Sequence, residues 1–273
     1  MIYIKRLPAG QLFDVELLDI NCKPQTPVPH RHEYFEIFWV LSGEGSQSID
    51  FVKYPMTRRQ MYLITPGQVH ELHHLPDKLF AISFNAEFID TQNQLPIDRL
   101  FLQNRSKQPY VWIDEQGEKE LGDLISIIAR ELHSANADKE LMSTLLVGFL
   151  RYVMRYLDDN ESVPSAADMR MVKLLKLIDA DFSLRKDTGY YSEKLSMTNK
   201  RLNELTRQQF SRTVTQLIHD KVIVEARREL AFTNKTIKTI AIELGYKDTS
   251  YFCRFFKRLS GQSPQSFRDT WIK

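Results

Sequence analysis

Hydrophobic and polar positions change their spacing along the chain. Up to about residue 86, short apolar runs rich in aromatic and β-branched side chains alternate with turn residues. This pattern is typical of β-strands. Strands are expected at Glu33–Leu41, Ser48–Val52, Gln60–Ile64 and Leu79–Phe84, with turns at 42–45 and 66–67. Several short strands at this spacing predict a small sandwich or barrel.

Between about residues 115 and 157 the apolar side chains recur every three or four positions, which predicts amphipathic helices. One series is Leu121, Leu124, Ile125, Ile128 and Leu132, and a second is Leu141, Leu145, Leu146, Phe149, Val153 and Tyr156. These helices can pack on their own sheet, or they can leave a stripe for a second copy of the chain. We expect a homodimer.

Residues 158–167 are polar and contain a proline, Pro164, as interdomain linkers do. The sequence after them has helical spacing almost to its end. A chain of 273 residues is longer than a typical single domain. We therefore expect an α+β protein with two domains, 1–157 and 168–273, joined by this linker.

Charge separates the same two parts. Residues 1–160 contain 16 Lys and Arg against 22 Asp and Glu, a net of −6, whereas residues 161–273 contain 21 against 13, a net of +8. The basic part suggests a polyanionic partner. No apolar run reaches the ~18 residues of a membrane span, the start lacks a signal-peptide pattern, and two cysteines are too few for a disulfide framework. We expect a cytoplasmic protein without membrane contact.

The segment 236–268 predicts a helix-turn-helix unit. Ile237, Ile240, Ala241 and Leu244 form one apolar face of a short helix, Gly245 suits the left-handed residue that ends it, and Asp248 can cap the next helix. On that second helix the phenylalanines 252, 255 and 256 face the core. A polar outer face remains, as a DNA-reading helix requires.

A weaker copy of this unit lies 50 residues earlier, where Leu202 takes the place of Phe252. Its first helix is expected at Tyr191–Leu195, its turn at Ser196–Thr198 and its second helix from Asn199 to Gln208. A connecting helix is expected from Asp220 to Phe232.

The unbroken stretch from Ala241 to Arg268 resembles the AraC/XylS family of transcriptional regulators. The resemblance is strong over about Met169–Ile272 and loose before it. It implies an all-α domain whose two recognition helices enter successive major-groove segments about 34 Å apart. The first unit departs from the family pattern at Thr206, Ser211 and Lys221.

Carried over by position, the resemblance implies a set of DNA-contacting residues on the two second helices. Arg254 suits guanine, Asn203 suits adenine and Glu204 suits a cytosine amino group. Each can instead contact only solvent or phosphate. The full set is Lys200, Asn203, Glu204, Arg207, Thr249, Ser250, Cys253, Arg254 and Lys257.

The N-terminal part carries a second motif, in which His30, His32 and Glu36 are followed by Gly43 and later by His70. Strand alternation places His30, His32, Glu36 and Phe38 on one face and points Trp39 the other way. The motif resembles the cupin barrel, the effector-binding half of many AraC-type regulators. In metal-binding cupins the positions of His30, His32, Glu36 and His70 ligate a divalent ion, although hydrogen-bonded histidines without metal explain them as well, and no cofactor is predicted.

A barrel interior is a natural site for a small molecule. The expected effector-binding residues are His30, His32, Glu36, Phe38, Tyr62 and His70, which suit a sugar or another polar metabolite. Core packing explains the aromatic members equally well.

These features predict a non-enzymatic, sequence-specific regulator that binds double-stranded DNA, responds to a small-molecule effector and acts on RNA polymerase. Whether it activates or represses stays open. Two alternatives remain. One is a cupin metalloenzyme, such as an oxygenase or isomerase, with an accessory DNA-binding domain. The other is a constitutive regulator whose barrel serves only to dimerise the chain.

Overall fold

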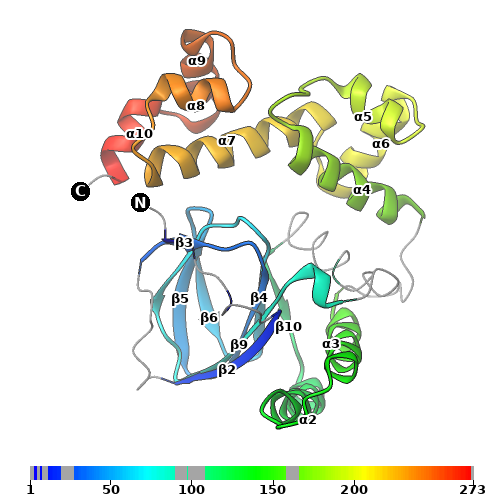
Figure 1. Cartoon of the computed structure of the whole chain (residues 1–273). Helices are drawn as coiled ribbons and strands as arrows, with labels where there is room; N and C mark the ends of the chain where they lie inside the picture. Colours follow the sequence, from blue (N-terminus) through cyan, green and yellow to red (C-terminus); the bar gives the residue numbers. More distant parts are fainter. Residues whose placement is uncertain are drawn as a thin grey trace. The chain divides into compact units, whose positions relative to one another are not determined.

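A computed structural model of the chain describes residues 3–4, 7, 12–19, 28–89, 97, 108–157 and 166–271. The chain divides into two compact units, one within residues 3–164 and one within 165–273 (Figure 1). The expected linker, 158–167, lies outside the described residues except for its last two positions, with which α4 begins.

The first unit contains two five-stranded sheets that face each other (Figure 1). One sheet has the order β1-β3-β8-β5-β6, and its strands are Tyr3–Ile4, His30–Arg31, His70–His74, Glu44–Ile49 and Val52–Thr57. The other has the order β10-β7-β4-β9-β2, and its strands are Tyr110–Trp112, Gln60–Ile64, Phe35–Ser42, Lys78–Phe84 and Phe13–Asp19. A 3-10 helix, η1, follows at Ala86–Phe88.

The second sheet is buried on both faces, which explains why β4 is apolar at nearly every position. Alternate residues of β4 point to opposite sides. Phe38 and Val40 join an apolar cluster with Tyr62, Ile64 and residues of the first sheet, whereas Ile37 and Trp39 pack against the helices. Trp39 therefore points away from Phe38, as alternation predicts.

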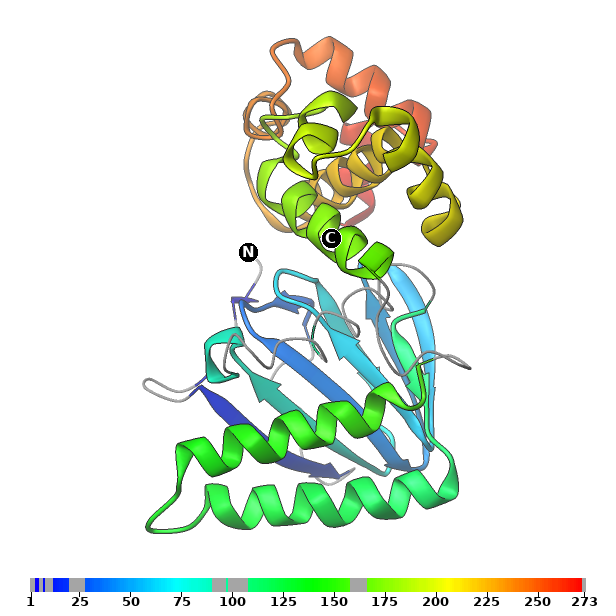
Figure 2. The same ribbon diagram turned by 90° about the vertical axis from the view of Figure 1, so that its right-hand side faces the viewer.

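Two helices, α2 (Glu115–Leu132) and α3 (Lys139–Met154), cross the outer face of this sheet (Figure 2). Asp114 accepts a hydrogen bond from the Gly117 amide and Asp138 accepts from the Glu140 amide, so each helix has an N-cap. The predicted apolar stripes face the sheet, because Leu121, Ile125, Ile128, Leu146 and Phe149 are fully buried, whereas Leu141, at the start of the second stripe, is 45% exposed. Packing on the chain's own sheet thus uses most of both stripes.

The predicted strand Ser48–Val52 is wrong, because the chain turns in its middle. Asp50 and Phe51 have positive φ values of 46° and 72° and join β5 to β6. The carboxylate of Asp50 accepts hydrogen bonds from the Val69 amide at 3.2 Å and from the Gln68 side chain at 3.3 Å. Aspartate adopts the left-handed conformation more readily than most residues. Here the bonds that hold its side chain come from residues 18 and 19 positions later, which the hydropathy pattern does not show.

The second unit consists of seven helices within residues 166–271 (Figure 1). The long helix α7 contacts α4 and α6 and also α8, α9 and α10, so it carries both halves of the domain. The helices are α4 (Ala166–Asp181), α5 (Thr188–Lys194), α6 (Asn199–Phe210), α7 (Val214–Phe232), α8 (Ile237–Glu243), α9 (Thr249–Ser260) and α10 (Pro264–Trp271). The connecting helix begins at Val214, six residues before the expected Asp220, because Thr213 and Gln216 form a capping box there.

The two helix-turn-helix units repeat the same local geometry. Leu202 in α6 and Phe252 in α9 are both fully buried, as the 50-residue offset predicts. In both turns the chain reverses through a left-handed residue, Ser196 at φ 52° and Gly245 at φ 80°. The Met197 amide donates to Ser192 and the Tyr246 amide donates to Ala241, so the two first helices end in the same way.

Candidate functional site

Helix α9 presents a polar face opposite its phenylalanine core. Phe252, Phe255 and Phe256 are buried, and Asp248 caps the helix by accepting from the Ser250 amide at 2.7 Å. The outer face consists of the predicted residues Thr249, Ser250, Cys253, Arg254 and Lys257, which are exposed or half-buried. Burial raises the pKa of the Cys253 thiol, so it is neutral on this surface.

Helix α6 presents the first-unit residues in the same way, with Lys200 and Arg207 exposed. Glu204 is also exposed, and its carboxylate lies 3.2 Å from the guanidinium of Arg201. An exposed pair of this kind contributes little to stability. A contact between Glu204 and a cytosine amino group would compete with this ion pair.

Asn203 differs from its neighbours, because both ends of its side chain are engaged inside the domain. Its carboxamide oxygen accepts from the Val214 amide at 3.0 Å, and its nitrogen donates to the Asn199 carbonyl at 3.0 Å. Val214 is the first residue of α7, whose amide has no partner within the helix. The predicted contact of Asn203 with adenine would require it to give up these bonds.

In the second helix-turn-helix, the corresponding helix start needs no such acceptor. At the 50-residue offset Val214 corresponds to Pro264, which begins α10 and has no amide hydrogen. Cys253 corresponds to Asn203 and faces no such donor. The structure therefore explains why a carboxamide side chain, Asn203, stands in the first helix-turn-helix and a thiol, Cys253, at the matching position of the second.

We expect Asn203→Ala to lower the free energy of unfolding by about 1 kcal/mol, because it leaves the Val214 amide without its acceptor. In a Val214→Pro background the same substitution should cost much less, since no amide remains to be satisfied. Thr213, which precedes residue 214, has φ −80° and ψ 163°, a conformation that accepts a following proline. Chemical denaturation of the parent chain, the two single variants and the double variant measures the coupling energy between positions 203 and 214. Equal costs in both backgrounds would contradict the assigned role.

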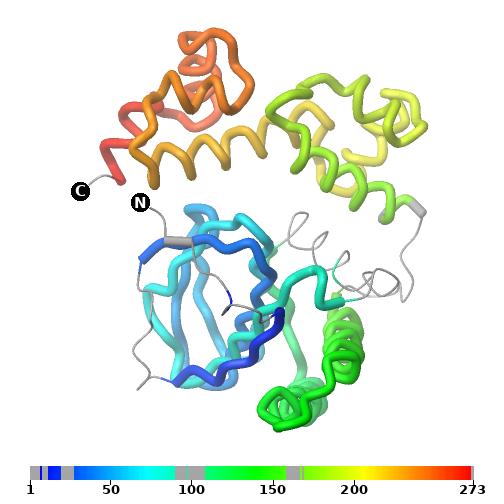
Figure 3. Tube along the Cα trace, viewed as in Figure 1, coloured from blue at the N-terminus to red at the C-terminus, as the bar shows by residue number. Residues whose placement is uncertain are grey.

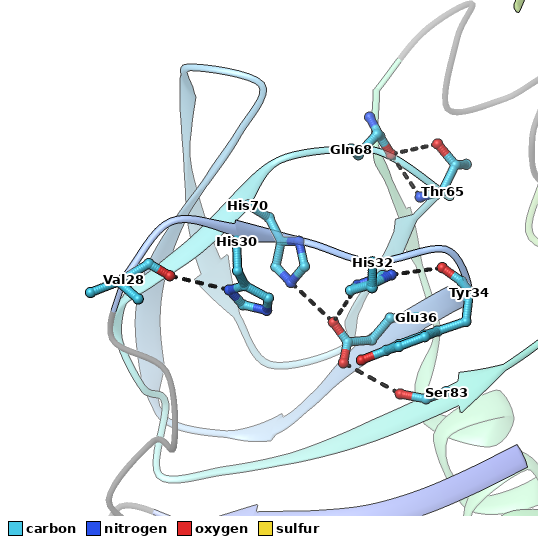
Figure 4. A network of polar contacts seen from close by, with 9 residues as sticks. All are labelled: Val28, His30, His32, Tyr34, Glu36, Thr65, Gln68, His70 and Ser83. Atoms are coloured by element: carbon cyan, nitrogen blue, oxygen red, sulfur yellow. Dashed lines mark hydrogen bonds and ion pairs between the residues drawn. The ribbon is translucent and has the colours of Figure 1, made fainter. Parts of the chain in front are cut away.

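The predicted histidines meet Glu36 in the space between the two sheets (Figure 4). Glu36 Oε2 lies 3.3 Å from His32 Nε2 and 3.1 Å from His70 Nε2, and Ser83 donates to the other carboxylate oxygen at 3.3 Å. The His30 ring lies 4.2 Å from the His70 ring. His30, His32, Glu36 and His70 are at most 4% exposed. We call these four residues the His-Glu cluster.

The expectation that His30 and His32 share one strand with Glu36 is wrong in its detail. Strand β3 contains only His30 and Arg31, and β4 starts at Phe35. His32 lies in the connection, where its Nδ1 atom donates to the Tyr34 carbonyl at 2.7 Å and its ring stacks on Tyr34. This local hydrogen bond turns the imidazole back toward Glu36, so the cluster forms without a continuous strand.

Hydrogen bonds fix which nitrogen of two histidines faces the centre of the cluster. His30 Nδ1 lies 3.2 Å from the Val28 carbonyl and His32 Nδ1 lies 2.7 Å from that of Tyr34. Both Nδ1 atoms must therefore carry hydrogen, which leaves each Nε2 lone pair directed inward when the ring is neutral. Backbone carbonyls hold metal-binding histidines in the same way.

Burial acts on the ionisation of these groups. Desolvation and the neighbouring His70 lower the pKa of His30 to about 4, and desolvation lowers that of His32. Burial alone would raise the pKa of Glu36, but its close contacts with the His32 and His70 rings hold it well below its ordinary value. The cluster therefore combines a buried carboxylate with two imidazoles, those of His30 and His32, that resist protonation. A buried carboxylate is costly unless it is paired and hydrogen-bonded.

One polar residue of the interior was missed by the sequence reasoning. Gln47 of β5 is fully buried, and neither its amide nitrogen nor its amide oxygen has a hydrogen-bond partner among the described residues. The incorrect start of the strand, at Ser48, concealed that residue 47 alternates inward with Ile49. An unsatisfied buried amide marks a place where a polar ligand can supply the partners.

Of the two predicted aromatic residues, Phe38 reaches the cluster, with its ring 5.8 Å from that of His70. Tyr62 lies opposite Phe38 in the β4–β7 register, but its hydroxyl is already bonded to the Pro55 carbonyl and to Gln60. Tyr62 therefore packs in the wall of the interior, and its polar atom is satisfied there.

Comparisons with known proteins agree with both motifs. Residues 191–270 match the helix-turn-helix domain family, and residues 20–81 match the cupin domain family. The transcriptional activator RhaR of Mannheimia succiniciproducens is 21% identical over 251 residues, which cover 91% of this chain and 90% of that protein. The HTH-type transcriptional regulator YfiF of Bacillus subtilis is 24% identical over 89% of this chain and 79% of its own. ToxT of Vibrio cholerae is similar to 96% of the chain and covers its own whole chain, with a TM-score of 0.48 and 16% identity.

The fold, the two recognition helices and these relatives define a DNA-binding transcriptional regulator with a cupin-like N-terminal domain. Within this class, its two domains and its RhaR relatives are similar to those of the AraC/XylS family. Among the described residues, no helix combines the length and the apolar character that a membrane crossing requires.

Proposed function

We propose that the chain is a ligand-responsive regulator, in which a polar small molecule bound between the two sheets changes how the helix-turn-helix domain engages its DNA sites. The observation that carries this proposal is the unsatisfied amide of Gln47 in an interior that also holds the His-Glu cluster. Leaving such an amide unpaired costs stability. A ligand with both a donor and an acceptor, such as a sugar or another hydroxylated metabolite, would remove that cost.

The named relatives include transcriptional activators, which supports activation through RNA polymerase as the output. DNA binding supports a place in the cytoplasm, and the regulator relatives support a role without catalysis. The homodimer is part of the same proposal. Ile127 and Leu141, 43% and 45% exposed on α2 and α3, are available to a second copy, and light scattering of the full chain measures its mass.

Gel-shift and footprinting experiments with the full chain and genomic fragments test the regulator. We expect sequence-selective binding that weakens steeply with salt, because lysines and arginines displace counterions from the phosphates. Binding that shows no preference among fragments, at any salt concentration, would overturn the proposal.

Gln47→Leu tests the ligand site. We expect it to raise the free energy of unfolding of the ligand-free chain by about 1 kcal/mol, because it removes a buried amide without partners. It should also abolish the rise in melting temperature that a bound metabolite produces in a thermal-shift screen of sugars and polar metabolites. Gln116→Leu, at an exposed position on α2, is the matched control and should change neither result. A Gln47→Leu chain that still responds fully to the metabolite would contradict the site.

A divalent cation is a second candidate ligand, favoured by the inward Nε2 atoms of His30 and His32 beside the Glu36 carboxylate. Atoms of His30, Glu36 and His70 lie within 4.8 Å of one another, so these three residues fit a cation with nitrogen and oxygen ligands, and His32 Nε2 lies 3.3 Å from the same Glu36 carboxylate. The cation would add positive charge beside the buried carboxylate and would present an open position to the metabolite. The chain's own part is to orient the imidazoles through the Val28 and Tyr34 carbonyls.

Metal analysis and thermal shift test this candidate. We expect Zn²⁺, Mn²⁺ or Fe²⁺ to raise the melting temperature of the EDTA-treated chain, because a ligand that binds only the folded state stabilises it. His32→Ala should abolish the shift, whereas His133→Ala, an exposed histidine after α2, should keep it. If neither ion content nor a shift is found, the cluster is a hydrogen-bonded core and the metalloenzyme alternative loses its support.

A further inference from the structure

The loop between α4 and α5 connects the two helix-turn-helix units through a partly buried lysine. Lys186 Nζ donates to the Leu244 carbonyl at 2.6 Å, to the Ser183 carbonyl at 2.9 Å and to the Phe182 carbonyl at 3.2 Å. Its ammonium also lies 4.9 Å from the centre of the Tyr246 ring. Phe182 and Ser183 follow α4, whereas Leu244 ends α8, the first helix of the second unit. One side chain therefore joins the end of α4 to the end of α8, whose Leu244 lies 58 residues after Lys186 in the chain.

The donors of the Lys186 ammonium match the free acceptors at the ends of the two helices. The last carbonyls of a helix have no partners within it and carry partial negative charge. A lysine ammonium has three donors, and three carbonyl oxygens lie within reach. Burial lowers the pKa of Lys186, so the lysine is held there at a desolvation cost that the carbonyl contacts offset.

The loop that carries Lys186 is fixed to the first helix-turn-helix by three hydrogen bonds. The Arg185 amide donates to the Asp181 carbonyl at 2.8 Å, and the Arg185 carbonyl accepts from the Tyr191 hydroxyl at 2.8 Å. Tyr190 of α5 donates to the Asp181 carboxylate at 2.7 Å. These bonds tie the loop of Lys186 to α5, which packs against α6.

The same loop also contacts the second helix-turn-helix. A Cβ atom at Gly245 would lie 1.7 Å from the Ser183 carbonyl oxygen, so the two backbones are in direct contact at this turn. Tyr246 is buried against Phe252 and Phe255, with ring centres 5.3 and 5.4 Å away, and these residues hold α9. Lys186 and its loop thus act on the position of α9.

These contacts add a second connection beside α7, which spans the domain with α4–α6 toward one end and α8–α10 toward the other (Figure 3). A single helix leaves two bodies free to rock about it, whereas two separate connections restrain their relative rotation. We propose that Lys186 is a positioning residue that fixes the separation and rotation of α6 and α9, and so sets the spacing of the two DNA segments that the chain reads. Only the effect on the spacing of the two DNA segments rests on the proposed DNA-binding function; the positioning of α6 and α9 does not.

The first test needs no DNA. Spin labels on native Cys253 of α9 and on an introduced cysteine, Arg207→Cys of α6, with Cys22→Ser, report the distance distribution between the two helices in the full chain. We expect one narrow distribution that broadens or shifts in Lys186→Met, which keeps the side chain's length but loses its donors. Lys173→Met, on the exposed face of α4, removes the same charge and should leave the distribution unchanged. An unchanged distribution in Lys186→Met would overturn the proposal.

The second test selects binding sites for the full chain from a random DNA library. The parent chain should enrich two half-sites at one spacing, and Lys186→Met should enrich the same half-sites at several spacings. Its affinity for the preferred spacing should fall by about tenfold, because the two contacts no longer support each other, while single half-site affinity stays the same. An equal loss on single half-sites, or an unchanged spacing preference, contradicts a positioning role. If the parent chain selects no site, the proposed function fails while the distance measurement still decides this inference.

Loss of the fold must be separated from loss of positioning. Circular dichroism and thermal unfolding of each variant serve this purpose. If Lys186→Met is unfolded, Lys186→Gln, whose shorter side chain brings its donors short of the Leu244 carbonyl, is carried through both measurements. A parent-like result from it would show that the contact with Leu244 is not needed and would likewise overturn the proposal.

Discussion

Gly245→Ala is expected to destabilise the DNA-binding domain severely, by about 3 kcal/mol or more. The new Cβ atom would lie 1.7 Å from the Ser183 carbonyl oxygen, and the residue would also have to keep a φ of 80°. Neither partner can move easily, because the close contact is with backbone. We expect the variant to lose DNA binding and to show an early unfolding transition by calorimetry, while the cupin-like domain still melts as in the parent chain.

Gly261→Ala is a matched control for the backbone conformation. Gly261 ends α9 at a φ of 83°, but its Cβ would meet nothing within 4 Å among the described residues. It should therefore cost only about 1 kcal/mol, the penalty of the left-handed region for a residue with a Cβ. Similar losses at both positions would show that conformation, and not the contact with Ser183, determines the need for glycine at 245.

Arg254→Ala is expected to weaken binding to the preferred DNA site by about 2 kcal/mol, or roughly thirtyfold, and to relax the preference at one base pair. Arg254 is exposed on the outer face of α9, one turn after its N-terminus, where a guanidinium can reach a guanine edge. Titration against the selected site and its single-base variants measures both effects.

Lys257→Ala distinguishes base reading from general attraction. Lys257 lies one turn further along the same face, where a phosphate contact is expected. Its loss should weaken binding to all sequences to a similar degree. It should also lower the slope of log affinity against log salt concentration by about one, because one fewer counterion is released. If Arg254→Ala behaves in the same uniform way, Arg254 contacts phosphate and the second unit reads its bases through other residues.

The sequence was most informative where local chemistry is sufficient. Alternation placed Phe38 inside and Trp39 outside β4, and the second helix-turn-helix could be described down to the left-handed Gly245 and the Asp248 cap. In these cases the period of the apolar residues, or one residue's backbone preference, decides the structure. Both motif-bearing halves of the chain were identified in this way.

The sequence was least informative where a contact joins residues that are far apart in the chain. The Asn203 side chain is engaged by an amide eleven residues later, and Lys186 by a carbonyl 58 residues later. Neither bond has a periodic signature. Gln47 was missed because the hairpin turn at Asp50 depends on Val69 and Gln68, which no local propensity reports.

The different chemistry of Asn203 and Cys253 has a consequence for how the two halves of the domain can change over generations. A side chain that must satisfy the Val214 amide cannot be exchanged freely, whatever DNA sequence it faces. Because Pro264 makes no such demand, position 253 can accept new side chains at little cost to folding. Altered operator preference should therefore arise more readily through the second recognition helix than through the first, whose Asn203 is also needed for folding.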